Sequence, residues 1–99
     1  MPGVVQGRMF GYPIYKVKGS MFACVYGPGV ALKLPEHRVA ELLTRRGNQP
    51  FAPRDRVMRE WVMVVRKESR SYLRLRGLFL ESIEFTGRSA KKREEARRE

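Results

Sequence analysis

Three short apolar segments in the first half of the chain, joined by turns that contain glycine, constrain the fold most strongly. Residues 12–18, YPIYKVK, alternate apolar and basic positions. Tyr15 and Val17 therefore share one side of an extended chain, and Lys16 and Lys18 share the other. A period of two residues is typical of a half-buried β-strand, so this segment is expected to lie in a sheet with one face covered.

The next two segments extend the same pattern. Gly19 can adopt positive φ without steric penalty, which predicts a tight hairpin turn. Residues 20–26, SMFACVY, are apolar at nearly every position, as in a central strand covered on both faces. Residues 27–29, GPG, interrupt this run, and residues 30–34 alternate again with Val30, Leu32 and Leu34 on one side. Together the segments predict an antiparallel meander of three strands.

A helix is expected to follow the meander. Pro35 suits the first position of a helix, where its missing N–H has no consequence, and Glu36 suits the first turn. The segment Arg45-Arg46-Gly47 would provide basic residues for the last turn and a glycine stop. The apolar stripe expected to face the core consists of Val39, Leu42 and Leu43.

The second half of the chain predicts a loop, a strand and a long helix. Residues 47–56, GNQPFAPRDR, indicate an irregular basic loop, and residues 58–65 have strand composition with Trp61, Met63 and Val65 on one face. From Ser69 the spacing becomes helical, with apolar positions at Tyr72, Leu75, Phe79 and Ile83. We interpret residues 1–87 as a single α+β domain. Residues 88–99 are either a solvated helical extension or a disordered tail, and their composition favours the tail.

Charge is the outstanding feature of the composition. The chain carries 21 Lys+Arg against 10 Asp+Glu, a formal net charge of +11. A field of this sign attracts polyanions, and nucleic acid is the first such partner to consider. A GC-rich genome also enriches a protein in arginine. Composition alone leaves both explanations open.

Other classes of protein are disfavoured. The single cysteine excludes an internal disulfide and suits a reducing compartment. The N-terminal residues lack the pattern of a secretory signal, and no segment approaches the roughly 20 apolar residues of a membrane helix. We therefore expect a cytoplasmic protein that does not enter a membrane.

No group of residues predicts catalysis. Cys24 lies within an apolar strand, where a buried structural thiol is the usual outcome, and His37 has no partner that would make it a catalytic base or a metal ligand. The methionines in apolar runs are expected to fill the core, and these are Met9, Met21, Met58 and Met63. The sequence therefore predicts neither an enzyme nor a cofactor.

The basic positions are the remaining candidates for a site. Gathered on one surface they would contact phosphates without reading sequence. The candidate nucleic-acid-binding residues are Lys16, Lys18, Lys33, Arg45, Arg46, Arg54, Arg56, Arg59, Lys91, Lys92 and Arg93. Tyr12, Tyr15 and Phe51 could stack on bases, although aromatic residues in strands more often belong to the core. An ordinary solvated basic surface is the favoured alternative.

Several short motifs occur in a characteristic order. They are Met9-Phe10-Gly11, then Tyr15-x-Val17-x-Gly19-x-Met21-Phe22-Ala23, then Leu32-Lys33-Leu34, and finally Gly47-x-x-Pro50-Phe51. In order and spacing this set resembles the TfoX N-terminal domain family, the N-terminal domains of competence regulators. The resemblance implies a two-layer α+β domain, similar to YjbR-like proteins, in which helices cover one side of an antiparallel sheet. It implies no catalytic residue and no cofactor. Within the first motif, Phe10 is expected to fill the core and Gly11 to let the chain bend into the sheet.

The chain also departs from that family. Family members usually begin with an amphipathic helix, whereas only seven residues precede Arg8 here, and the second domain of the full-length regulators is absent from this sequence. A missing helix would leave part of a sheet face uncovered, and we expect a second copy or a partner protein to cover it. The sequence thus predicts a small non-enzymatic regulatory or interaction module, and the resemblance implies a link to the regulation of transcription or competence. The alternative is a nucleic-acid-binding accessory protein that makes non-specific phosphate contacts.

Overall fold

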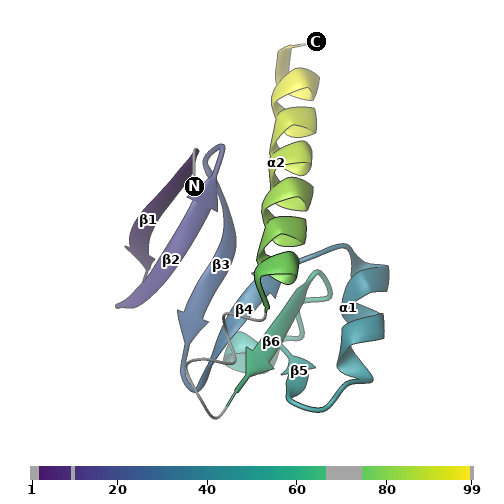
Figure 1. Ribbon diagram of the computed structural model, residues 1–99. Helices are drawn as coiled ribbons and strands as arrows, with labels where there is room; N and C mark the ends of the chain where they lie inside the picture. Colours follow the sequence, from purple (N-terminus) through teal and green to yellow (C-terminus); the bar gives the residue numbers. More distant parts are fainter. Residues whose placement is uncertain (1–2, 10, 67–74, 99) are drawn as a thin grey trace.

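The computed structural model describes residues 3–9, 11–66 and 75–98 of the chain. Within them, a six-stranded antiparallel sheet of order β1-β2-β3-β4-β6-β5 combines with two α-helices in an α+β fold (Figure 1). The strands are β1 Val4–Met9, β2 Tyr12–Val17, β3 Ser20–Tyr26, β4 Gly29–Lys33, β5 Asn48–Pro50 and β6 Trp61–Val65. The helices are α1 Glu36–Leu43 and α2 Arg76–Arg98, with a short 3-10 turn η1 at Pro53–Asp55.

The predicted meander is confirmed in β2, β3 and β4. Lys18 and Gly19 connect the first two strands with φ values of 50° and 77°. Positive φ at both central residues of a two-residue loop matches the twist of the strands it joins, so the hairpin is tight. Gly11, with φ of 83°, makes the expected bend into β2. Phe10 lies outside the described residues.

A bulge interrupts the pairing of β2 with β3. Tyr15 lies opposite Ala23, and the next residue, Lys16, lies opposite Met21. Phe22 is therefore the extra residue on β3. As a result, Phe22 and Ala23 both pack in the main core, while Met21 packs with the smaller cluster of the opposite face.

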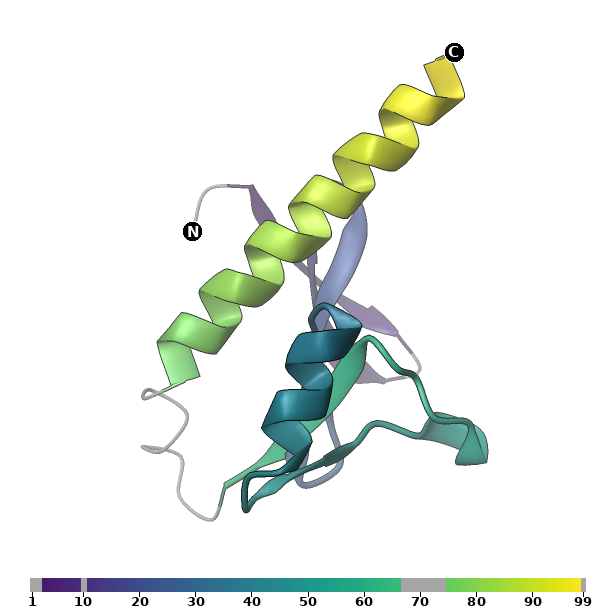
Figure 2. The same ribbon diagram turned by 90° about the vertical axis from the view of Figure 1, so that its right-hand side faces the viewer.

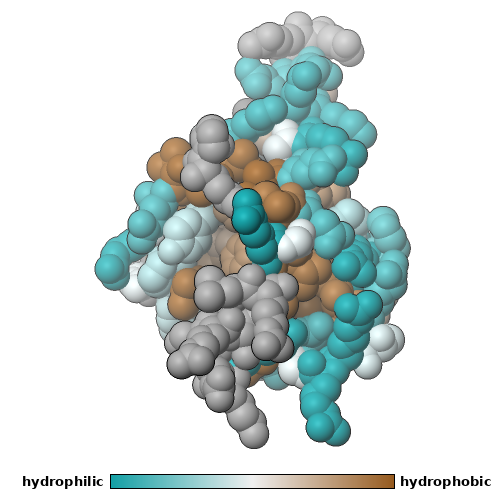
Figure 3. Space-filling view, viewed as in Figure 1, coloured by the Kyte–Doolittle hydropathy of each residue, from teal (hydrophilic) through white to brown (hydrophobic). Residues whose placement is uncertain are grey.

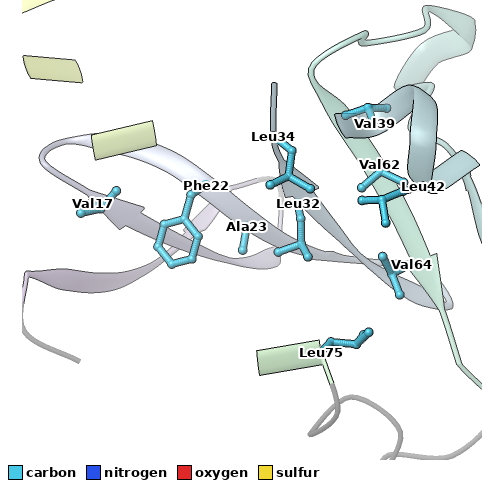
Figure 4. Close-up of a cluster of buried hydrophobic side chains, with 10 residues drawn as sticks. All are labelled: Val17, Phe22, Ala23, Leu32, Leu34, Val39, Leu42, Val62, Val64 and Leu75. Atoms are coloured by element: carbon cyan, nitrogen blue, oxygen red, sulfur yellow. The ribbon is translucent and has the colours of Figure 1, made fainter. Parts of the chain in front are cut away.

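Both helices lie on the same face of the sheet, as Figure 2 shows. This arrangement confirms the predicted two-layer fold with helices on one side. The main core between the layers draws on the meander, on β6 and on both helical segments (Figure 4). Its buried members are Val17, Phe22, Ala23, Leu32, Leu34, Val39, Leu42, Val62, Val64 and Leu75. Phe79 and Ile83 of α2 pack against it as predicted, while Tyr72 lies outside the described residues.

Helix α1 is shorter than predicted. Pro35 is the N-cap, with ψ of 145°, rather than the first helical residue, and Leu43 ends the helix. The last turn therefore contains no basic residue. Nearby side chains donate hydrogen bonds to the carbonyl groups of this turn. The Thr44 hydroxyl donates to the Glu41 carbonyl at 2.7 Å, and the side-chain amide of Asn48 donates to the Leu42 carbonyl at 2.9 Å. Leu43 is 37% exposed, so its assignment to the buried stripe was wrong.

Two strands were missed and one was predicted too long. β1 pairs with β2 along its whole length, with Val4 opposite Val17 and Met9 opposite Tyr12. β5 lies within the segment predicted as a loop and pairs with β6 at the far edge of the sheet. β6 itself begins at Trp61, because residues 58–60 form a turn.

Helix α2 continues into the charged C-terminal segment. Of the two alternatives for residues 88–99, the structure has the helical extension, which reaches Arg98. Two hydrogen bonds attach this helix to the β2–β3 hairpin: the Ser82 hydroxyl donates to the Phe22 carbonyl at 2.9 Å, and the Arg93 guanidinium donates to the Ser20 hydroxyl at 2.7 Å. Figure 3 shows a hydrophilic surface over the C-terminal half of α2. Neither helix of the described chain combines the length and apolar character needed to cross a bilayer.

Candidate interaction surface

The sheet face turned away from the helices carries a second set of apolar side chains. Residues directly opposite each other on neighbouring antiparallel strands share a face, which places Ala31 with Met63 and Lys33 with Trp61. We call this surface the open face. By the same register its side chains are those of Val5, Met9, Tyr12, Ile14, Lys16, Met21, Cys24, Tyr26, Ala31, Lys33, Gln49, Trp61, Met63 and Val65. Neither α-helix of the described residues lies on it.

A loop covers one part of the open face. Phe51 is 6% exposed and packs against Trp61 with ring centroids 5.7 Å apart. Backbone hydrogen bonds fix the loop, since the Met58 N–H donates to the Phe51 carbonyl at 2.9 Å and the Trp61 N–H donates to the Met58 carbonyl at 3.1 Å. A small buried cluster forms beneath it, consisting of Ile14, Cys24, Ala31, Phe51, Trp61 and Met63.

An apolar groove of about 490 Å³ lies beside this loop. Its lining comes from β1, β2 and β3 and from the loop, and consists of Met9, Tyr12, Met21, Cys24, Tyr26, Phe51, Pro53, Arg54 and Met58. Met9, Tyr12 and Met58 are 40%, 38% and 39% exposed. The prediction that the methionines fill the core holds for Met63, which is buried. It was wrong for Met9, near the end of an edge strand, and for Met58, in a turn.

A row of aromatic rings runs along the groove into the buried cluster. Tyr12 and Tyr26 have ring centroids 4.8 Å apart, and Tyr26 meets Phe51 edge-on at 5.4 Å and 83°. Such contacts hold the rings in defined orientations. Of the predicted stacking residues, Phe51 is buried and Tyr15 packs against the helical core, so both belong to the core. Tyr12 alone among the three is exposed.

Cys24 lies in this groove without the features of a nucleophile. Its side chain is 6% exposed, and burial raises the pKa of the thiol, which favours the neutral and unreactive form. His37 is exposed on α1, away from Cys24 on the opposite side of the sheet. Among the described residues, no three His, Cys, Asp or Glu side chains gather in a group that could hold a metal ion.

The predicted nucleic-acid-binding residues do not gather on one surface. Lys33, Arg56 and Arg59 line a second pocket, of about 560 Å³, together with Glu36 and Glu60. The two carboxylates offset part of the positive charge of this pocket, and Nη1 of Arg59 lies 3.9 Å from Oε1 of Glu36. We call this the mixed-charge pocket.

The other predicted basic residues are distributed over separate elements. Lys16 is on the open face, Lys18 is in the hairpin turn, and Arg54 lines the apolar groove. Arg45 and Arg46 follow α1, while Lys91, Lys92 and Arg93 are exposed on α2. The hydrogen bond from Arg93 to Ser20 brings that part of α2 beside the hairpin that carries Lys18.

The strands of the sheet share a charge pattern that was not predicted from the sequence. None of the six strands contains aspartate or glutamate, and their only charged residues are Arg8, Lys16 and Lys33. The signal was present in the sequence, because Glu36 is the first acidic residue of the chain. Every charge contributed by the strands is therefore positive.

Comparison of the chain with models of known protein families, with curated proteins and with solved structures finds no match. The resemblance to the TfoX N-terminal domain family accordingly stays a prediction from motifs.

Proposed function

We propose that this protein is a non-enzymatic interaction module that binds a partner protein through the apolar groove of its open face. A regulatory role of this kind is what the resemblance to the TfoX N-terminal domain implies. The observation that carries the proposal is the groove itself, in which Met9, Tyr12 and Met58 are each more than a third exposed. Exposed apolar side chains gathered in one place are typical of a protein-binding site.

The chemistry of the lining supports a protein ligand. Methionine side chains are flexible and polarisable, so they adapt to side chains of different shapes, and Met9, Met21 and Met58 all line the groove. Tyr12 adds a ring whose apolar body can be covered while its hydroxyl stays in water. Complete burial of a large apolar side chain contributes about 1.5–3 kcal/mol, so a partner that partly buries Met9, Tyr12 and Met58 gains binding free energy from each of them.

Site-specific photo-crosslinking tests the proposal. A photoreactive phenylalanine analogue replaces Met58 in the full chain, and the matched control carries it at Leu80, an exposed apolar position of α2 on the other side of the sheet. In an extract of the source cells, we expect a discrete adduct from position 58 that Tyr12→Glu abolishes. Equal adducts from both positions, or none from position 58, would contradict the proposal.

The partner can also be a second copy of the chain. Light scattering at micromolar concentration distinguishes the two cases. A dimer that Met58→Glu converts to a monomer would identify the second copy as the occupant, whereas a monomeric mass in both proteins would leave a different protein as the partner.

Nucleic-acid binding is the second candidate function. It is favoured by the net charge of +11 and by strands that carry only positive charge. We expect binding of this type to fall steeply as salt rises, because each neutralised phosphate releases counterions. Titration of duplex and single-stranded DNA at several salt concentrations measures this slope, with the triple variant Lys91→Ala, Lys92→Ala, Arg93→Ala testing α2. Absence of binding at low ionic strength would remove this candidate.

A further inference from the structure

We infer that the partner segment held by the apolar groove is acidic, and that it combines carboxylates with apolar anchor side chains. This inference rests on the proposed function and specifies the chemistry of the ligand. It depends on how the groove is joined to its charged surroundings, rather than on net charge alone.

The apolar groove and the mixed-charge pocket are neighbours. Pro53 and Met58 line both of them, so one continuous surface passes from an apolar to a cationic environment. The combined lining contains four cations against two carboxylates, because Arg54 adds to the charged residues of the mixed-charge pocket. Asp55 lines neither cavity.

The rest of the open face reinforces this bias. Lys16 is its only further charged strand residue, because Lys33 already lines the mixed-charge pocket, and Lys16 is also positive. A ligand that places apolar side chains in the groove therefore meets cations beyond its rim, and carboxylates on that ligand are favoured by charge complementarity. Such attraction also accelerates association at low salt.

A second copy of the chain fits this surface poorly. Face-to-face pairing would bring Lys16 and Lys33 of the open face and Arg54 of the groove toward a second set of the same cations, and each chain has a net charge of +11. Like charges placed across an interface oppose association. An acidic segment of another protein removes this repulsion, so it is the occupant that the charges favour.

The groove is also better suited to side chains than to nucleobases. Base stacking requires open aromatic faces, yet Tyr26 meets Phe51 edge-on and Phe51 and Trp61 are buried. Tyr12 is the most exposed ring of the lining, and three of the other lining residues are methionines, which are suited to packing around aliphatic or aromatic side chains.

Binding of defined peptides to the intact protein, followed by fluorescence anisotropy, tests the inference. The first probe is a labelled amphipathic peptide of Leu, Phe, Asp and Glu. In the second, Lys replaces every acidic residue, and in the third, Ser replaces every apolar residue. A single-stranded DNA oligonucleotide of matched length is the fourth. We expect the first peptide alone to bind in the groove, with at least a threefold weaker affinity at about 200 mM salt than at about 50 mM.

Variants of the protein show where the peptide binds. Met58→Glu is expected to weaken the acidic amphipathic peptide at least tenfold, whereas Leu80→Glu leaves the affinity unchanged. The double variant Arg54→Gln, Arg56→Gln is expected to weaken it severalfold and to reduce its salt dependence. The photoreactive analogue at position 58 gives an independent readout, because a peptide bound in the groove should crosslink to it and a peptide bound elsewhere should not. Trp61 fluorescence verifies that each variant is folded.

Each other outcome overturns the inference. Equal binding of the lysine peptide refutes the charge component, and equal binding of the serine peptide refutes the apolar component. An oligonucleotide that crosslinks to position 58 more efficiently than the peptide does would make nucleic acid the ligand. A crosslinked partner whose bound segment lacks carboxylates leaves the proposed function intact and refutes this inference alone. Absence of an adduct at position 58 refutes the proposed function itself.

Discussion

Two consecutive leucines of α1 provide a direct test of how the helical layer is attached. Leu42 is 1% exposed and belongs to the main core, whereas Leu43 is 37% exposed. Replacement by alanine changes intrinsic helix propensity equally at both positions. A difference between Leu42→Ala and Leu43→Ala therefore reports the packing of each side chain, with the local helix as an internal control.

The expected difference is large. Replacing a fully buried leucine by alanine removes transfer free energy and leaves a cavity, at a cost of about 2–5 kcal/mol. We expect about 3 kcal/mol for Leu42→Ala and about 1 kcal/mol or less for Leu43→Ala, whose side chain is partly in water in the folded state. For a domain with a total stability of about 5–15 kcal/mol, the first loss is substantial.

Urea unfolding followed by Trp61 fluorescence measures both variants. Trp61 is the only tryptophan and is 5% exposed in the sheet, so its emission reports global unfolding. With a urea slope of about 1.5 kcal/mol/M, Leu42→Ala should lower the midpoint by about 2 M. Equal midpoints for the two variants, or a larger loss for Leu43→Ala, would show that α1 presents a different side to the sheet and would refute the packing described here.

Three further predictions follow from individual contacts. Gly29→Ala should destabilise the fold by about 1–3 kcal/mol in urea unfolding, because the added Cβ would lie 2.5 Å from the Val64 carbonyl oxygen of β6. Gly77→Ala should instead stabilise the fold by up to about 1 kcal/mol, because a Cβ at this position of α2 meets no other atom and alanine favours a helix. The raised pKa of Cys24 means that the folded state retains the thiol proton, so stability should fall as pH rises through the alkaline range, and Cys24→Ala should remove this part of the decline. Arg38→Met breaks the 3.0 Å ion pair with Glu81 and should lower the free energy of unfolding by less than about 1 kcal/mol. The loss should be smaller in 1 M NaCl, because salt screens exposed charges. A loss of the same size in salt would contradict an electrostatic origin.

The central part of the fold was predictable because burial leaves a periodic signal. Leu32 and Leu34 alternate with the small Ala31 and the half-buried Lys33, and both leucines are fully buried in the main core. β1 escaped prediction because it is an edge strand: Val5 is 63% exposed, and Gly7 interrupts any apolar alternation. Local patterning is weak wherever a strand gains its stability from a neighbour rather than from a covered face.

The candidate site was less predictable than the fold. Met9 and Met58 are far apart in the sequence, and only the pairing of β1 with β2 and the loop after β5 bring them to one groove. Residue type alone favoured burial for both. The charge asymmetry of the strands was visible in the sequence, whereas the junction of the apolar groove with a cationic pocket depends on tertiary structure.

The bulge at Phe22 has a consequence for how the two layers are aligned. Apolar packing between a helix and a sheet does little to fix the position of the helix along its own axis, because one leucine can take the place of another. The bulge leaves the Phe22 carbonyl available on the helical side, and the fully buried Ser82 hydroxyl of α2 donates to it. A one-turn shift of α2 that brings Leu78 to the place of Ser82 would leave the Phe22 carbonyl without this bond in a dry environment. Together with the exposed bond from Arg93 to Ser20, this buried polar contact helps to set the position of the helix along the sheet.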